Sequence, residues 1–194
     1  MINYTYNLNE EIARWTTEVY IKKNPKLKWW VAFTNPTAGP WKKVTVPSEE
    51  GTDIEIYRFV REEERPDLIL VNDNLKVVLV VEAKDYVEKL IVGDQMTKSI
   101  RVIEEMTRVL NQSENLHWKN KKNYKIIPSF LWMCKNSSNI QKECDIIQKE
   151  FIAKWNGPRQ SILNIVISKD DNENLTNTFV YKNQTFKNLD FEFN

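Results

Sequence analysis

The sequence predicts an α/β (α+β) fold in which a central mixed β-sheet is flanked by α-helices. Two observations predict it: short apolar runs alternate with longer segments of helical periodicity, and two apolar runs flank a short polar turn. The chain of 194 residues is long enough to bury a substantial core. Because no internal repeat or low-complexity linker is visible, we expect a single domain over residues 1–194.

The first half of the chain is expected to contain a helix, two strands and a hairpin. Asn9 can cap the helix, whose apolar side chains recur at helical spacing. Prolines and a Gly-Pro pair break up residues 24–53 into strand and loop. The expected elements are a helix over 10–22, strands over 28–34 and 54–60, and hairpin strands over 67–71 and 77–83.

The second half alternates helices with apolar runs. Apolar residues at helical spacing predict two amphipathic helices, and the runs between them predict strands. The Asn-rich tail leaves room for an edge strand. The expected elements are a helix over 93–111, a strand over 124–133, a helix over 139–155, a strand over 162–168 and an edge strand over 179–182.

The hairpin RPDLILVNDNLKVVLVVEAKD carries charges where apolar residues are expected. With the turn centred between Asp73 and Asn74, Asp67 lies roughly opposite Val80, and Glu82 lies two residues further along. Side chains alternate between the faces of a strand, so Asp67, Glu82 and Lys84 point the same way. Diagonal cross-strand neighbours have Cα atoms about 7–8 Å apart. The two carboxylates can therefore share one metal ion.

The type of metal follows from the donor atoms. Carboxylate oxygens with open water positions suit Mg²⁺ or Mn²⁺. The two cysteines, Cys134 and Cys144, lack metal-ligand spacing, and the chain has one histidine, so a zinc site or a disulfide framework is not expected. Surface charges reaching solvent would be the plain alternative, but three of them on one face of a buried hairpin favour a site.

The net charge of +1 hides an uneven distribution. Residues 115–160 carry nine Lys/Arg and three Asp/Glu, whereas residues 61–114 carry eight and twelve. An acidic segment with a metal site beside a basic segment suits an enzyme that cuts phosphodiesters. A basic surface that only contacts solvent would give the same charge counts. No charged-then-apolar leader and no apolar run of 18 residues is present, so we expect a cytoplasmic protein that does not bind membranes.

The segments Pro66-Asp67 and Glu82-Ala83-Lys84, set on a hairpin followed by a helix, resemble the motif of the PD-(D/E)xK nuclease superfamily, which includes many type II restriction endonucleases. The resemblance implies a restriction-endonuclease-like core and a metal-dependent DNA endonuclease. It implies that Asp67, Glu82 and the Ala83 carbonyl bind Mg²⁺, with Mn²⁺ as a possible substitute. It also implies that Lys84 holds or polarises the attacking water.

Many members of this superfamily add a glutamate from the first helix. The candidates here are Glu10, Glu11 and Glu18, and Glu11 is favoured because it lies beside the apolar face; all three could instead be surface charges. Gln95 opens the helix after the motif and is a further candidate contact to DNA, although it could instead be a plain helix-start residue. Some exonuclease-type relatives have a glutamine there with a tyrosine four residues on, but Ser99 takes that place here.

Three lysines in the loop before the strand at 124–133, Lys119, Lys121 and Lys122, are the candidate contacts to the DNA backbone. Three functions remain open. The first is a type II restriction endonuclease that cuts double-stranded DNA as a homodimer, since two strands call for two sites related by symmetry. The second is a structure-specific or repair nuclease such as a junction resolvase. The third is a non-catalytic DNA-binding module.

Overall fold

The computed structural model describes a β-sheet and the helices that cover it. Most of the first 65 residues lie outside the described residues. The described residues are 17, 21–23, 25–34, 46–47, 53–54, 66–112, 123–157, 161–169, 172, 174–182 and 184–186. All structural statements below concern these residues.

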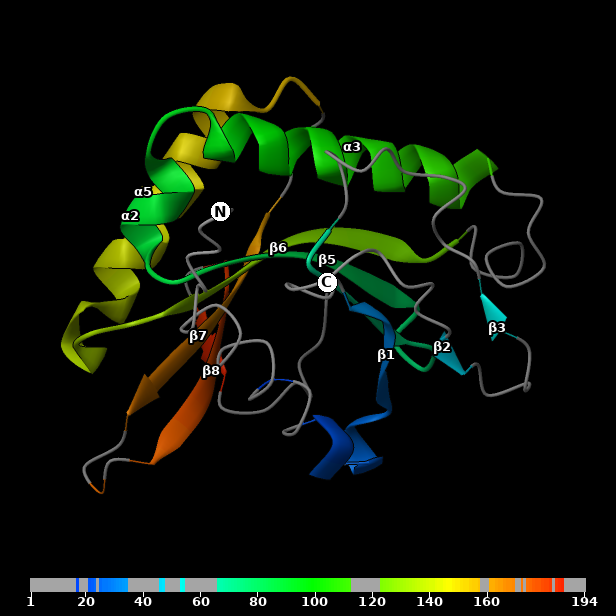
Figure 1. The fold of residues 1–194 in the computed structure, drawn as a ribbon, viewed down its shortest axis with the longest axis horizontal. Coiled ribbons are helices and arrows are strands. Elements are labelled where there is room, and N and C mark those ends of the chain that lie inside the picture. Colours follow the sequence, from blue (N-terminus) through cyan, green and yellow to red (C-terminus); the bar gives the residue numbers. More distant parts are fainter. Residues whose placement is uncertain are drawn as a thin grey trace, which may run out of the picture.

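A mixed seven-stranded sheet forms the centre of the fold, in the order β1-β4-β5-β6-β7-β8-β9 (Figure 1). The central strands β5, β6 and β7 are parallel, and the outer strands pair antiparallel. The strands are β1 (Trp29–Thr34), β4 (Leu68–Asn72), β5 (Val77–Lys84), β6 (Lys125–Met133), β7 (Leu163–Lys169), β8 (Leu175–Tyr181) and β9 (Gln184–Phe186). The strands β2 (Val46–Pro47) and β3 (Asp53–Ile54) pair separately.

Three helices cover one face of the sheet. They are α2 (Val87–Ile91), α3 (Gln95–Gln112) and α5 (Ile140–Lys154), and α3 runs along the sheet in Figure 1. Their buried residues, such as Met96 and Phe151, share one core cluster with Val78 and Val80 of β5. The opposite face of β5 packs in a second cluster, which includes Ile21 from the helical segment Ile21–Lys23.

The strand β5 is covered on both faces, as its sequence predicts. Val77, Leu79, Val81 and Ala83 belong to the second cluster, and each is at most 1% exposed. Because β5 lies between the helices on one face and the second cluster on the other, both faces of the strand are largely shielded from water. This burial explains why its sequence is almost entirely apolar. The fold is therefore α+β with a mixed sheet flanked by helices, as expected.

The boundaries of most predicted elements agree with the structure to within two residues. One prediction is wrong: the segment over 179–182 is not an edge strand. It is the end of β8, which pairs on both sides, because β9 adds a further strand beyond it. The short helices α2, Pro25–Leu27 and Ser137–Asn139 were not predicted. The parts of the predicted helix over 10–22 and strand over 54–60 beyond Thr17, Ile21–Lys23 and Ile54 lie outside the described residues.

Within the part of the chain that the structure describes, no helix is long and apolar enough to cross a membrane.

Candidate active site

The hairpin of β4 and β5 carries the predicted site, but its register differs from the prediction. The pairs Leu68↔Val81 and Asn72↔Val77 put the centre of the turn between Asn74 and Leu75, one residue later than expected. The ladder ends at Leu68↔Val81, so Asp67 lies beside Val81 and Glu82 rather than opposite Val80. The Asp67 amide donates to the Val81 carbonyl at 3.0 Å, which closes this end of the ladder.

The corrected register preserves the predicted face. A shift of two residues returns every side chain to the same side of a strand. Val80, two residues before Glu82, packs in the cluster beneath α3 and α5, and Ile69, two residues after Asp67, packs in the same cluster. Asp67, Glu82 and Lys84 thus belong to the face of the sheet that the helices cover.

Hydrogen bonds draw the four motif residues together. The Ala83 amide donates to Asp67 Oδ2 at 2.7 Å. Lys84 Nζ donates to Glu82 Oε1 at 2.7 Å and to the Ala83 carbonyl at 2.9 Å, and it lies 3.8 Å from Asp67 Oδ2. The side chains of Asp67, Glu82 and Lys84 are 11%, 14% and 16% exposed. The group is therefore largely shielded from water but still reachable from the surface.

The position of the Lys84 ammonium tests whether these residues fit a metal ion. Three oxygens, from Asp67, Glu82 and the Ala83 backbone, surround one positive charge within 4 Å. These are the oxygens that the resemblance assigns to Mg²⁺, so the lysine stands in for a cation among them. Two carboxylates and a carbonyl, completed by water, are a donor set that Mg²⁺ accepts. No set of three or more His, Cys, Asp and Glu side chains in the described ranges could hold a metal, so any ion here depends on the carbonyl and water.

Two further charged residues, which the sequence did not indicate as site residues, lie next to the motif. Asp85 is 5% exposed and accepts a hydrogen bond from Lys89 Nζ at 2.5 Å. The Lys135 ammonium lies 4.3 Å from the centre of the Tyr86 ring. Asp85 directly follows the motif, and a carboxylate at the end of a buried strand is the sequence feature that could have identified it. Lys135 comes from the end of β6, and only the parallel pairing of β5 with β6 brings it close.

Of the remaining predicted site residues, the structure describes only Gln95. Gln95 begins α3, as expected, and its backbone carbonyl accepts a hydrogen bond from the Ser99 hydroxyl at 2.9 Å. Ser99 is 1% exposed and so packs within the core. Glu11, Lys119, Lys121 and Lys122 lie outside the described residues.

Comparisons with protein-family models, with curated proteins and with solved structures find no match for this chain. The interpretation of the site therefore depends on its own geometry and chemistry.

Proposed function

We propose that this protein is a Mg²⁺-dependent DNA endonuclease whose active site is Asp67, Glu82, Ala83 and Lys84. One observation carries the proposal: two carboxylates and a carbonyl converge on a single cation position at the end of a buried hairpin. Buried charges are costly unless they are compensated, so such a cluster is more typical of a functional site than of a structural one.

The chemistry assigned to each residue follows from its contacts. Asp67, Glu82 and the Ala83 carbonyl would hold Mg²⁺, or Mn²⁺ in its place. When bound, the ion supplies Lewis-acid chemistry at the phosphate and makes water more acidic. Lys84 is close enough to the same oxygens to orient the attacking water and to stabilise negative charge that develops on the phosphate. Water displaces the leaving oxygen directly, and no covalent bond forms to the protein.

The Asp67 carboxylate has a second task in this proposal. Its Oδ2 accepts the Ala83 amide at 2.7 Å, which fixes the backbone that presents the Ala83 carbonyl. The same contact ties the end of β4 to β5, so both carboxylates are held by one hairpin. Sites built on strands are positioned more accurately than sites on loops.

The finer form of the proposal is a type II restriction endonuclease with a restriction-endonuclease-like core. Such an enzyme cuts double-stranded DNA at a short specific site and acts as a homodimer, because two strands require two symmetry-related sites. The PD-(D/E)xK resemblance of Pro66-Asp67 and Glu82-Ala83-Lys84 supports this form. Cleavage of branched DNA alone would favour a junction resolvase-like enzyme instead.

The test is digestion of a mixed-sequence plasmid with Mg²⁺ or with EDTA, followed by sequencing of the ends. We expect Mg²⁺-dependent cleavage at discrete positions by the wild-type protein and none by Lys84→Ala or Glu82→Gln. Glu104→Gln, an exposed carboxylate on α3, is the matched control and should cut normally. Equal cutting by Lys84→Ala and wild type would disprove the site assignment.

A further inference from the structure

Lysines gather at the end of the sheet opposite the candidate active site. This end, where β5 and β6 begin, is formed by the segment before β1, the β4–β5 turn and the start of β6. The β8–β9 turn lies level with Val81 of β5, because Tyr181 pairs with Leu163, Leu163 with Ser129 and Ser129 with Val81, and it adjoins this end through the hydrogen bond from Lys125 Nζ to the Tyr181 hydroxyl at 3.3 Å. The register shows that Trp29, Asn72, Val77 and Lys125 lie level with one another. We call the five exposed lysines Lys22, Lys28, Lys76, Lys125 and Lys182 of these segments the lysine rim.

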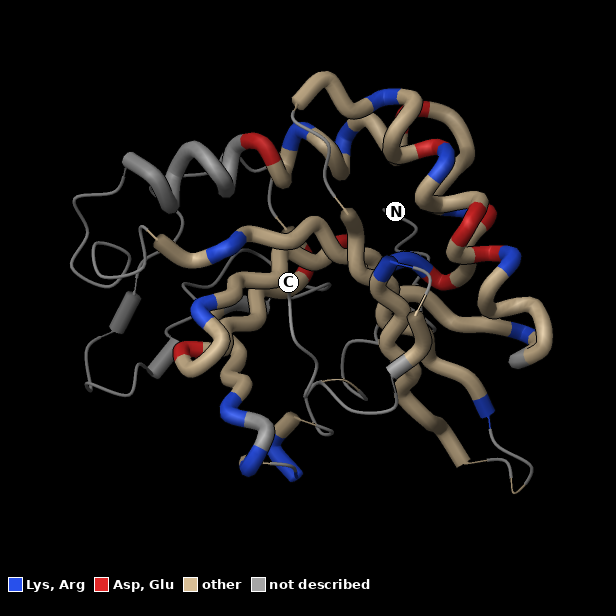
Figure 2. The backbone as a smooth tube through the Cα atoms, turned by 180° about the vertical axis from the view of Figure 1, so that it is seen from behind, with Lys and Arg blue, Asp and Glu red and all other residues tan. Residues whose placement is uncertain are grey.

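Few acidic residues in the same four segments balance the positive charge of the lysine rim. Lys23 and Lys26 add two further exposed ammonium groups. Asp73 is the one acidic residue among the described residues of these four segments. Its Oδ2 accepts from Trp30 Nε1 and its Oδ1 accepts from the Tyr124 hydroxyl, each at 2.8 Å. Figure 2 shows the blue lysine segments before β1 and at the β4–β5 turn at this end.

The backbone adds an independent observation. The described non-glycine residues with positive φ are Lys28 at 58°, Lys76 at 54° and Lys182 at 49°, and all three belong to the rim. Left-handed backbone is unfavourable for a residue with a Cβ, and turns at such positions favour Gly or Asn. Each of the three lysines therefore places an ammonium group at a turn at a backbone cost that Gly or Asn would avoid.

A hollow opens beside the rim. It has a volume of about 660 Å³, within the range of ligand pockets, and two rim lysines and two tryptophans contribute to its wall. The lining residues are Ile21, Lys22, Pro25, Lys28, Trp29, Trp30, Val31, Asp73 and Asn74. Trp29 is 6% exposed, whereas Trp30 is half-buried and packs in part against the core cluster beneath the helices, so Trp30 is the more exposed of the two rings.

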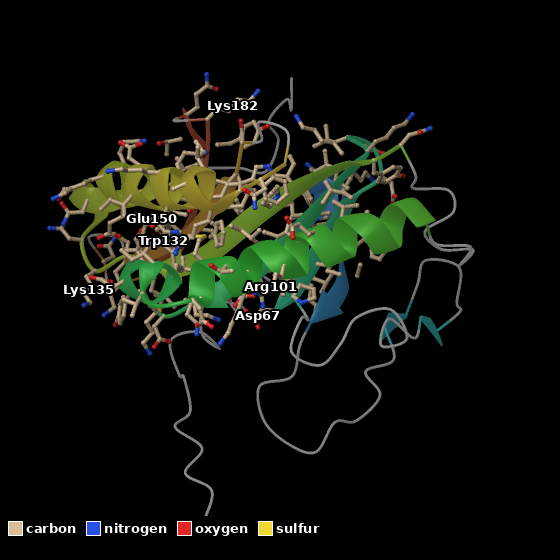
Figure 3. All side chains as sticks on the ribbon, turned by 90° about the horizontal axis from the view of Figure 1, so that it is seen from above. Asp67, Arg101, Trp132, Lys135, Glu150 and Lys182 are labelled. Carbon is tan, nitrogen blue, oxygen red and sulfur yellow. The ribbon has the colours of Figure 1, made fainter. Side chains whose placement is uncertain are left out.

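We propose that the lysine rim and its hollow form a binding surface for single-stranded nucleic acid, separate from the candidate active site. Phosphates would contact the rim lysines, and an unstacked base would enter the hollow against Trp30, as aromatic platforms accept single-stranded bases. Strands lie about 4.8 Å apart, so Lys28 to Lys125 spans about 14 Å across β1, β4, β5 and β6, enough for several phosphates. A duplex keeps its bases stacked and cannot fill the hollow. In Figure 3, Lys182 is well separated from Asp67.

The test measures binding of a fluorescein-labelled 20-nucleotide single strand in EDTA, where no metal-dependent cleavage can occur. The rim variant Lys28→Gln/Lys76→Gln/Lys125→Gln should bind at least ten-fold more weakly than wild type. Each phosphate contact on a single strand contributes about 0.7 to the slope of log K against log salt, so the slope should fall by about two. The control Lys98→Gln/Lys142→Gln/Lys149→Gln removes the same charge from exposed helix positions and should stay within two-fold of wild type.

Two further variants address folding and the hollow. Lys76→Gly removes a rim charge and suits the positive φ, so it should fold at least as well as wild type and still bind more weakly. Trp30→Leu should weaken binding of the single strand, whereas Trp30→Phe keeps a ring and should retain most of it; both lose the hydrogen bond to Asp73.

Three outcomes would overturn the proposal. They are equal losses in the rim and control variants, tighter binding of a duplex of equal length, and rim-dependent binding of phosphatidylserine vesicles without binding of the oligonucleotide. Because the assay contains no Mg²⁺, loss of the proposed nuclease activity would leave these results unaffected.

Discussion

At the scale of single residues, Lys84 holds the position that the proposed metal ion would take. Its ammonium donates to Glu82 Oε1 and to the Ala83 carbonyl, so an ion that uses these oxygens must displace it. Lys84→Met should therefore abolish cleavage and yet bind Mn²⁺ several-fold more tightly, because like charges repel at this distance. Isothermal titration measures the affinity, and Lys89→Met, which disturbs the exposed partner of Asp85, is the control. Weaker Mn²⁺ binding by Lys84→Met would show that the lysine does not compete with the ion.

Asp67 is predicted to matter for stability as well as for catalysis. Asp67→Ala leaves the buried Ala83 amide without its acceptor, and a lost acceptor of this kind costs about 1–3 kcal/mol. Asp67→Asn keeps an oxygen that can accept this bond, so its free energy of unfolding should lie closer to that of wild type. Urea unfolding at pH 7 measures the difference. Both variants should lack cleavage, and equal stability of the two would contradict the structural role of the carboxylate.

At the scale of elements, the predicted order of strands and helices agrees with the structure, but the hairpin turn was placed one residue too early. The local sequence Asn72-Asp73-Asn74 offers several turns of similar quality. The structure selects one of them through contacts that are distant in sequence: Trp30 of β1 and Tyr124 before β6 both donate to Asp73. The face on which the site lies was predictable, because side chains alternate strictly with period two. The residue opposite Asp67 was not predictable, because it depends on where the turn is centred.

These contacts make Asp73 a testable anchor of the hairpin. Asp73→Ala should lower the free energy of unfolding by about 1–3 kcal/mol, because two donors lose their acceptor. Burial, with help from Asp73, raises the pKa of Tyr124 to about 12 from 10.0. The variant should therefore also lower the pKa of Tyr124, which ultraviolet titration detects. An unchanged Tyr124 titration would show that the carboxylate does not act on the phenol.

At the scale of the whole molecule, the sequence indicated that charge is uneven but not where it gathers. The count over residues 115–160 predicted a basic segment, whereas the lysine rim draws on segments near residues 22–28, 76, 125 and 182. Only the sheet order, the register and the contact between Lys125 and Tyr181 bring these lysines together. The acidic motif lies at the other end of the same strand, so β5 separates the candidate active site from Lys76 and Lys125 by its own length. Counts over one stretch of sequence cannot detect a surface assembled from four separate segments.

The two free cysteines link the packing of the whole molecule to pH. Burial raises the pKa of Cys134 to about 11 and that of Cys144 to about 12, from an ordinary value of 9.0. At pH 8 the folded protein then holds roughly a hundred-fold less thiolate at Cys134 than an unfolded chain, so reaction with Ellman's reagent should be slow until urea is added. Rapid reaction of the folded protein would contradict the burial of both thiols.

The same shifts predict how stability depends on pH. The unfolded chain releases its thiol protons near pH 9, before the folded protein does, so it binds fewer protons above that pH. The thiols therefore contribute their full stabilisation below about pH 9, and this contribution falls as the pH rises toward 11. Cys144→Ala removes one of these groups, so urea unfolding should show a smaller loss between pH 8 and pH 10.5 for the variant than for wild type. Equal losses of unfolding free energy in the variant and the wild type would mean that Cys144 has the same pKa in the folded and unfolded states. The cavity that the variant leaves lowers the free energy of unfolding equally at both pH values, so it does not affect this comparison.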